Sequence, residues 1–172
     1  MSRSAAFHRF QQDHAHVLEG VDELERSLGP CLTSEIRPAQ ESAVRELLEL
    51  LQRQFATHMR AEEEVLFPVL ARALPGSSST LEPLEAEHAE LREMLSDLCN
   101  WLASPRSPAR DAHLRIELRD FLDLIRLHVA KEEAAVFVVA ERVLTRYELE
   151  FIESRLALEP GGGDSTTRRS TP

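Results

Sequence analysis

The sequence predicts an all-α protein, an up-down-up-down four-helix bundle with a short C-terminal fifth helix and a disordered tail. Two observations lead to this fold. Apolar residues recur at three- and four-residue spacing over four long segments, as on the buried face of a helix. Proline and glycine fall between those segments, so the connections are short. We expect one domain over residues 1–158 and a tail over 159–172.

The first half of the chain contains two of the four long helices. The first is predicted from about Ala5 to Leu28 and stops at Gly29-Pro30. A loop follows through about residue 37, and Pro38 can occupy the first turn of a second helix that runs to Leu74. Pro68 lies inside this second helix, where we expect it to kink or locally break the helix.

The third and fourth helices begin with a capping residue followed by proline. Thr80 is the expected N-cap of the third helix, with Pro83 in its first turn, and the helix ends near Leu102. Ser107-Pro108 opens the fourth helix, which is predicted to continue to about Leu144. Four long helices with short connections therefore remain antiparallel to their neighbours.

A short fifth helix and a tail complete the chain. Residues Thr145 through Glu148 match a capping box, which predicts a helix to about Leu158. From Pro160 onward the composition is rich in Gly, Ser and Thr and predicts disorder.

Charge and composition exclude several classes of partner and location. The net charge of −10 argues against nucleic-acid and anionic-membrane partners, because both require a basic surface. No stretch approaches the 18 apolar residues of a membrane span, and the N-terminus lacks the apolar block of a signal peptide, so we expect a cytoplasmic protein. Cys31 and Cys99 form no Cys-x-x-Cys pair, and we expect both to be reduced structural thiols.

The sequence contains an internal echo. His58 through Arg72 reads HMRAEEEVLFPVLAR, and His128 through Arg142, 70 residues later, reads HVAKEEAAVFVVAER. A fainter echo relates Asp13-His14-Ala15 to Glu87-His88-Ala89. Two helical hairpins related in this way can pack as a pseudo-symmetric pair, with equivalent side chains on opposite sides of one axis.

Polar residues interrupt the apolar stripes of all four long helices. Each interruption follows the spacing of the buried face rather than that of the polar face. The six residues are His14, His58, Glu62, His88, His128 and Glu132. Three other histidines, His8, His16 and His113, lie off the stripes.

Burying these six residues requires compensation. An unpaired buried carboxylate costs at least several kcal/mol and a neutral polar group roughly 1–3 kcal/mol, whereas a whole domain is stable by only about 5–15 kcal/mol. The six residues can pair with one another in a purely protein network, or the helix phase can differ so that they lie on the surface. The third alternative, which we favour, is that they share a metal.

The spacing of the ligand types favours a dinuclear site. In each His-x-x-x-Glu pair the two side chains leave the same helix face. Imidazole with carboxylate suits iron, zinc, copper or manganese, and six ligands exceed what one tetrahedral zinc binds. If both glutamates bridge two irons and an oxo or hydroxo group joins them, about two of roughly twelve octahedral positions stay open for dioxygen, peroxide or nitric oxide.

The order His, His-x-x-x-Glu, His, His-x-x-x-Glu, with one element per helix, resembles the hemerythrin-like (HHE cation-binding) domain. Two further segments are similar to that family: Glu63-Glu64-Val65-Leu66-Phe67-Pro68 and Lys131-Glu132-Glu133. The resemblance covers about residues 5–145. It implies a four-helix bundle with an oxo-bridged di-iron centre, whose metal ligands are His14, His58, Glu62, His88, His128 and Glu132.

The sequence departs from the oxygen-carrying members of that family at two places. Arg92 stands where those proteins have another histidine, which leaves one iron more open and argues against plain reversible oxygen storage. Those proteins also place the last carboxylate five residues after its histidine, so Glu133 is an alternative to Glu132, and Glu63 similarly to Glu62.

Three functions remain open at this point. The first is binding or sensing of dioxygen, nitric oxide or iron at the di-iron centre, with no protein partner identified. The second is a di-iron redox enzyme that breaks down hydrogen peroxide, as a catalase does. The third is a helical interaction protein without metal. Asp13 and Glu87 each precede a predicted ligand. One interpretation is that they support the ligands from outside, but we favour the solvated surface because neighbours along a helix point in different directions.

Overall fold

The computed structural model describes residues 5–29 and 36–158, which form helices joined by short connections. The first and third rods of the bundle are single helices, α1 (Ala5–Leu28) and α5 (Ser78–Ala103). The second rod consists of α2 (Pro38–Leu50), η1 (Leu51–Phe55), α3 (Ala56–Ala61), η2 (Glu62–Leu66) and α4 (Phe67–Ala73), in which η denotes a π-helical turn. The fourth rod consists of α6 (Pro108–Lys131), η3 (Glu132–Val136) and α7 (Phe137–Val143), and α8 (Arg146–Ala157) follows it.

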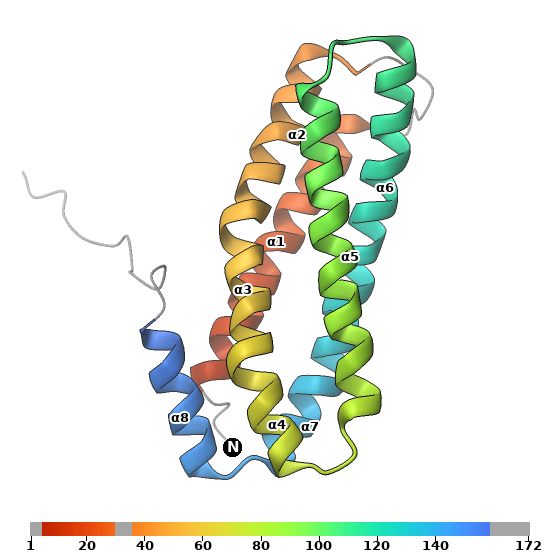
Figure 1. The fold of residues 1–172 in the computed structure, drawn as a ribbon. Helices are drawn as coiled ribbons and strands as arrows, with labels where there is room; N and C mark the ends of the chain where they lie inside the picture. The colour runs from red at the N-terminus through yellow and green to blue at the C-terminus, as the bar shows by residue number, and fades with distance from the viewer. Residues whose placement is uncertain (1–4, 30–35, 159–172) are drawn as a thin grey trace, which may run out of the picture.

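The four rods alternate in direction, as predicted (Figure 1). The first and third rods run one way, and the second and fourth run back beside them. Helix α8 turns back along the outside of the bundle and packs on α1 and η2, with Ile152 and Leu156 buried beneath it. The all-α bundle with a short C-terminal helix is therefore confirmed. The predicted disordered tail and Cys31 lie outside the described residues.

Two of the predicted N-caps, Ser107 and Thr145, are confirmed, whereas the third rod begins earlier than predicted. The Ser107 side chain accepts a hydrogen bond from the backbone N–H of Arg110, and Thr145 forms its capping box with Glu148. The third rod begins at Ser78, earlier than the expected N-cap Thr80, because the backbone N–H of Thr80 already donates to the carbonyl of Ser77. Pro83 consequently lies inside α5 rather than in its first turn.

The second and fourth rods each contain a π-helical turn that begins at a glutamate of the internal echo. These turns are η2, which begins at Glu62, and η3, which begins at Glu132. The rod continues through Pro68, which lies in the first turn of α4 directly after η2. Proline does not cause the π turn, because Val138 occupies the equivalent position after η3 and the same turn forms there. Isolated π turns inside helices occur frequently at functional sites.

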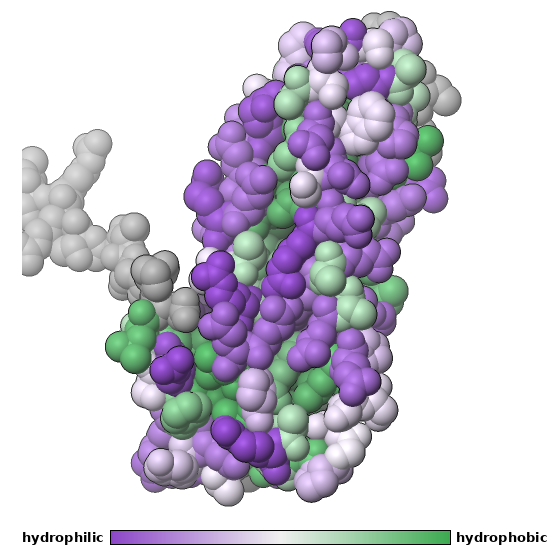
Figure 2. Space-filling model, viewed as in Figure 1, coloured by the Kyte–Doolittle hydropathy of each residue, from purple (hydrophilic) through white to green (hydrophobic). Residues whose placement is uncertain are grey.

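The apolar core forms two clusters separated by a polar layer. One cluster includes Val17, Phe55, Leu91 and Val129, and the other includes Phe10, Ala61, Leu84 and Val136. The six polar residues that interrupt the stripes lie close to the point at which each rod passes from one cluster to the other. The outer surface of the face in Figure 2 is mostly hydrophilic, and its hydrophobic residues gather toward the end where α8 packs. Within the described part of the chain no helix is long and apolar enough to cross a membrane.

Candidate metal centre

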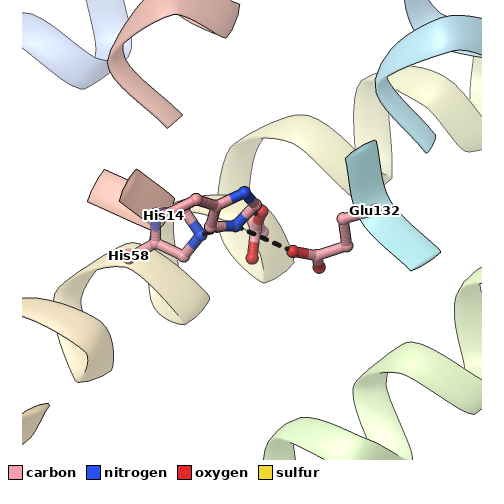
Figure 3. A group of neighbouring side chains, drawn as sticks. His14, His58 and Glu132 are labelled. Carbon is pink, nitrogen blue, oxygen red and sulfur yellow. Dashed lines mark hydrogen bonds and ion pairs between the residues drawn. The ribbon is translucent and has the colours of Figure 1, made fainter. Parts of the chain in front are cut away.

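The six polar residues of the helix stripes meet in the middle of the bundle. Each of the four histidines and two glutamates is at most 3% exposed. They come from all four rods: His14 from α1, His58 and Glu62 from the second rod, His88 from α5, and His128 and Glu132 from the fourth rod. Figure 3 shows His14 and His58 directed toward Glu132 across the space between the helices. The predicted helix phases are therefore correct, and the surface alternative is excluded.

The Nε2 atoms of the histidines point inward and face one another in two pairs. The Nε2 atoms of His14 and His58 lie 2.9 Å apart, and those of His88 and His128 lie 3.0 Å apart. The carboxylate of Glu132 lies 3.1 Å from the Nε2 of His14 and 3.2 Å from that of His128, so it reaches both pairs. Glu62 does the same, 3.3 Å from the Nε2 of His58 and 3.5 Å from that of His88.

The Nδ1 atom of every histidine in the layer contacts a carboxylate that lies outside it. These contacts are His14 with Glu133 (3.1 Å), His58 with Asp13 (3.2 Å), His88 with Glu63 (2.8 Å) and His128 with Glu87 (3.2 Å). A carboxylate can only accept, so each neutral imidazole donates its Nδ1–H outward. The lone pair of each Nε2 then points into the layer, which is the arrangement in which histidine binds metal ions.

The inner atoms of the layer lack enough donors. When the imidazoles are neutral and their Nδ1–H groups point outward, two facing Nε2 atoms are both acceptors and repel each other. All four carboxylate oxygens of Glu62 and Glu132 are buried without a hydrogen-bond partner. Burying such oxygens without compensation costs several kcal/mol. A cation among these atoms removes both problems, since two nitrogen donors at about 2.1 Å from one ion in adjacent octahedral positions lie about 3 Å apart.

The charges around the layer also call for positive ions. Six carboxylates surround the four imidazoles: Asp13, Glu62, Glu63, Glu87, Glu132 and Glu133. Two cations pair with the outer ones, Arg92 with Glu63 and Lys131 with Glu87. With neutral imidazoles, six negative and two positive charges leave four negative charges. Two divalent ions carry the four positive charges that balance them, and so do two ferric ions with an oxo bridge.

The pKa values of the buried groups show how strongly the layer attracts positive charge. Burial lowers the pKa of His58, but attraction to Glu62 and the contact with Asp13 raise it to about 10. Burial likewise lowers the pKa of His128, and Glu132 raises it above the usual value. Burial raises the pKa of Glu132, but the imidazoles beside it, His128 first, hold that pKa well below its usual range. Protons and metal ions therefore compete for the same nitrogen atoms.

Two groups of donor atoms in the described residues are compact enough to hold an ion. One comprises His14, His58, Glu62 and Glu132, and the other comprises Glu62, His88, His128 and Glu132. Within each group the donor atoms lie within 4.8 Å of one another. The two groups share both glutamates and together contain the six predicted ligand residues. Neither Glu63 nor Glu133, the sequence alternatives, belongs to a group, because each lies on the outer side of a histidine ring.

Contrary to expectation, Asp13 and Glu87 do not lie only on the solvated surface but contact histidines of the layer; the Asp13 side chain is still 42% exposed and that of Glu87 is 15% exposed. Each carboxylate contacts a histidine of a neighbouring rod: Asp13 contacts His58, and Glu87 contacts His128. A residue next to a ligand does point away from that ligand, but in a bundle this direction leads to the adjacent helix. The echo of Asp13-His14 in Glu87-His88 was the sequence signal for this role.

Aromatic rings close the sides of the polar layer. Phe137 stacks on His14 with ring centroids 5.5 Å apart, and Phe67 stacks on His88 at 5.8 Å. These two phenylalanines are buried and lie 70 residues apart, so they are equivalent in the internal echo. Phe55 also stacks on His58. Apolar rings hold the imidazoles in place and keep water from their faces.

Comparison with known proteins identifies one family. The model of the hemerythrin HHE cation-binding domain matches residues 5–140. No significant match to a curated protein or to a solved structure was found. The matched segment contains all four rods of the bundle except the end of α7, together with every residue of the polar layer.

Proposed function

The chain belongs to the hemerythrin HHE cation-binding domain family, and from this premise we propose that it is a non-haem di-iron protein that binds or senses a small ligand. The ligand class is dioxygen, nitric oxide or iron itself. The observation that carries the proposal is the set of four buried carboxylate oxygens without hydrogen-bond partners, surrounded by four inward Nε2 atoms.

Each half of the layer would hold one ion. His14 and His58 would bind the first and His88 and His128 the second, with Glu62 and Glu132 shared between them. Two bound iron ions would supply a redox-active centre with open positions for a diatomic ligand or peroxide. The histidine and carboxylate ligand types also fit zinc or manganese, but six donors favour a dinuclear site.

The protein residues would orient the ligands and protect the site. The outer carboxylates hold each imidazole in the tautomer whose Nε2 is free, and hydrogen bonds of this kind increase the basicity of a ligand histidine. The stacked phenylalanines and the two apolar clusters on either side exclude bulk water. Open positions would therefore be reached by small uncharged molecules more readily than by large or charged ones.

Iron uptake tests the proposal directly. Protein freed of metal should take up two ferrous ions per chain under anaerobic conditions, as measured by elemental analysis. After exposure to air it should develop the absorption of an oxo-bridged ferric pair. Failure to take up iron would overturn the proposal and favour a helical interaction protein without metal.

Peroxide separates binding from catalysis. When hydrogen peroxide is added to the iron-loaded protein, bleaching in proportion to the added peroxide supports a binding or sensing function. Sustained oxygen release over many turnovers would instead overturn it in favour of a peroxide-degrading enzyme. Matched measurements on His58→Ala, which should lose iron, and His16→Ala, which lies outside the layer, tie either result to this site.

A further inference from the structure

The two halves of the polar layer have the same inner donors but different outer charges. Each half has two imidazoles, and both share Glu62 and Glu132. Each imidazole also has one outer carboxylate at its Nδ1 atom. The inner donor sets are therefore equivalent in type, and any difference between the halves must come from what surrounds the outer carboxylates.

The outer carboxylates of the His88–His128 half are neutralised by cations. The Arg92 guanidinium donates to Glu63 at 2.9 Å, and the Lys131 ammonium pairs with Glu87. Both cations are partly exposed, at 40% and 43%, whereas the two carboxylates are 27% and 15% exposed. This half therefore carries no net outer charge.

Among the described residues, no lysine or arginine pairs with the outer carboxylates of the His14–His58 half. Glu133 accepts a hydrogen bond from the neutral amide of Gln11 at 3.0 Å. In the part of the chain that the structure describes, neither Asp13 nor Glu133 forms an ion pair with lysine or arginine. This half therefore carries two negative outer charges.

We propose that the two metal positions are electrostatically unequal, with the His14–His58 position binding a divalent ion more tightly than the His88–His128 position. The inference rests on the proposed function, because it concerns how the same two ions are held. Arg92 and Lys131 act as positioning residues: they orient Glu63 and Glu87, and their charges weaken the attraction of those carboxylates for the nearby ion. The chain thus has one retentive position and one more labile position.

The size of the difference in metal affinity between the two positions depends on how far water screens the outer charges. Asp13 and Glu133 are 42% and 35% exposed, so water reduces part of their charge. Changes in the outer contacts of metal-ligating histidines alter metal affinity by about 10- to 100-fold. We expect the two binding steps to differ by a factor in this range, at its lower end because of the screening.

Titration of the metal-free full chain with cobalt(II) tests the inference, since cobalt(II) substitutes for a ferrous ion without being oxidised during the experiment. Calorimetry should resolve two steps. In the double variant Arg92→Gln/Lys131→Gln, glutamine can still donate to the carboxylates but carries no charge. The weaker step should become about tenfold tighter, so that the two steps approach each other.

A charge-matched control removes two cations elsewhere. Arg119 and Arg146 form exposed ion pairs within their own helices. The variant Arg119→Gln/Arg146→Gln changes the net charge equally and should leave the separation of the steps unchanged. The inference would be overturned if two ions still bind but the separation between the two binding constants narrows equally in this control. It would also be overturned if that separation does not narrow in Arg92→Gln/Lys131→Gln. Circular dichroism checks that both variants are folded.

Removal of one ligand from each half identifies the positions. His14→Ala should abolish the tighter step and leave the weaker one, and His88→Ala should do the reverse. The opposite assignment would overturn the inference but leave the dinuclear site intact. If the unaltered chain binds no cobalt(II), the proposed function fails and the inference fails with it. Failure of the inference alone is recognised because two ions still bind.

Discussion

Two of the regions in which the bundle buries charge differ, because only one of them is balanced by the protein alone. The first region is the network around Arg110, at the end of the bundle where α6 begins. The second is the layer of histidines and glutamates between the two apolar clusters. Both contain charged groups that are at most 5% exposed. They differ in whether every hydrogen-bonding atom has a partner within the chain.

The Arg110 network is complete. The guanidinium donates to the carbonyls of Trp101 and Leu102 and to the carboxylates of Glu41 and Asp111, which uses all five of its N–H groups. Asp111 also accepts from the backbone N–H of Ile36 at 3.1 Å. A second guanidinium, that of Arg106, lies 3.5 Å from Glu41 and 3.7 Å from Asp111, so two positive charges face two negative ones. Such a network needs no ion, because its opposite charges and donors are matched.

In the polar layer, by contrast, protein atoms alone do not give every buried hydrogen-bonding atom a partner. With neutral imidazoles it has acceptors in excess, four unpartnered carboxylate oxygens and four surplus negative charges. The Arg110 region shows that this chain can build a satisfied buried network where one is needed for structure. An unsatisfied network in the same molecule therefore indicates a site that something else completes.

Removing the metal should cause the largest change in stability among the tests of these two regions. A chelator should lower the free energy of unfolding by about 4 kcal/mol relative to protein with ion at 1,000 times its dissociation constant. Denaturant unfolding with and without chelator measures this difference. His58→Ala and His128→Ala should each lose the ion of their own half of the layer and reduce the chelator effect, whereas His16→Ala and His113→Ala should retain the full metal content and the full effect. Unchanged metal content in both of the first two variants contradicts the ligand assignment, and loss of metal in either control indicates an error of helix phase.

Breaking the Arg110 network should destabilise the protein independently of metal. Arg110→Leu leaves Glu41 and Asp111 without their buried partner, which costs about 3–5 kcal/mol for a buried pair. We expect about 3 kcal/mol, because the Glu41 side chain is 17% exposed and water can reach it. Denaturant unfolding should show the same loss in metal-loaded and metal-free protein. A loss that depends on metal would mean that the two regions are coupled.

The free energy of unfolding at acidic pH should also depend on the Arg110 network. Burial raises the pKa of Asp111, but hydrogen bonds from Arg110 and Ile36 hold it below its usual value. A carboxyl with a lowered folded pKa contributes stability above its unfolded pKa and loses it as the pH falls through the folded pKa. Stability of metal-free protein should therefore fall as the pH drops below about 4. Asp111→Asn should cost about 2 kcal/mol at neutral pH and flatten this acid slope; an unchanged slope would exclude Asp111 as its source.

The smallest effect is expected at Pro68. The proline is exposed and stands after the π turn η2, whereas Val138 stands after the equivalent η3. Because both turns form, Pro68→Ala should change the free energy of unfolding by no more than about 0.5 kcal/mol and leave the metal content intact. Loss of metal in this variant would show that the proline, rather than the glutamate layer, maintains the turn.

Much of the layer was predictable because its signals are local. Helix α1 runs over the predicted residues, and the stripe residues of each helix are buried or partly buried. The positions of the histidines on those stripes follow from a period of 3.6 residues, which needs no knowledge of the partner helix. The π turns were not predicted, since the hydrogen-bond shift at Glu62 and Glu132 leaves the residue spacing in the sequence unchanged.

The sequence by itself determined the helices, the family and the six polar residues that enter the core, because helical periodicity and capping act over a few neighbouring residues. Only the tertiary structure decided which carboxylate supports which histidine and which buried charges are balanced. Asp13 reaches His58 and Glu133 reaches His14 across 45 and 119 residues of sequence. The full pairing of Arg110 joins groups up to 69 residues apart. Such contacts depend on the direction in which side chains cross the gap between two packed helices, and that direction is set when the rods come together.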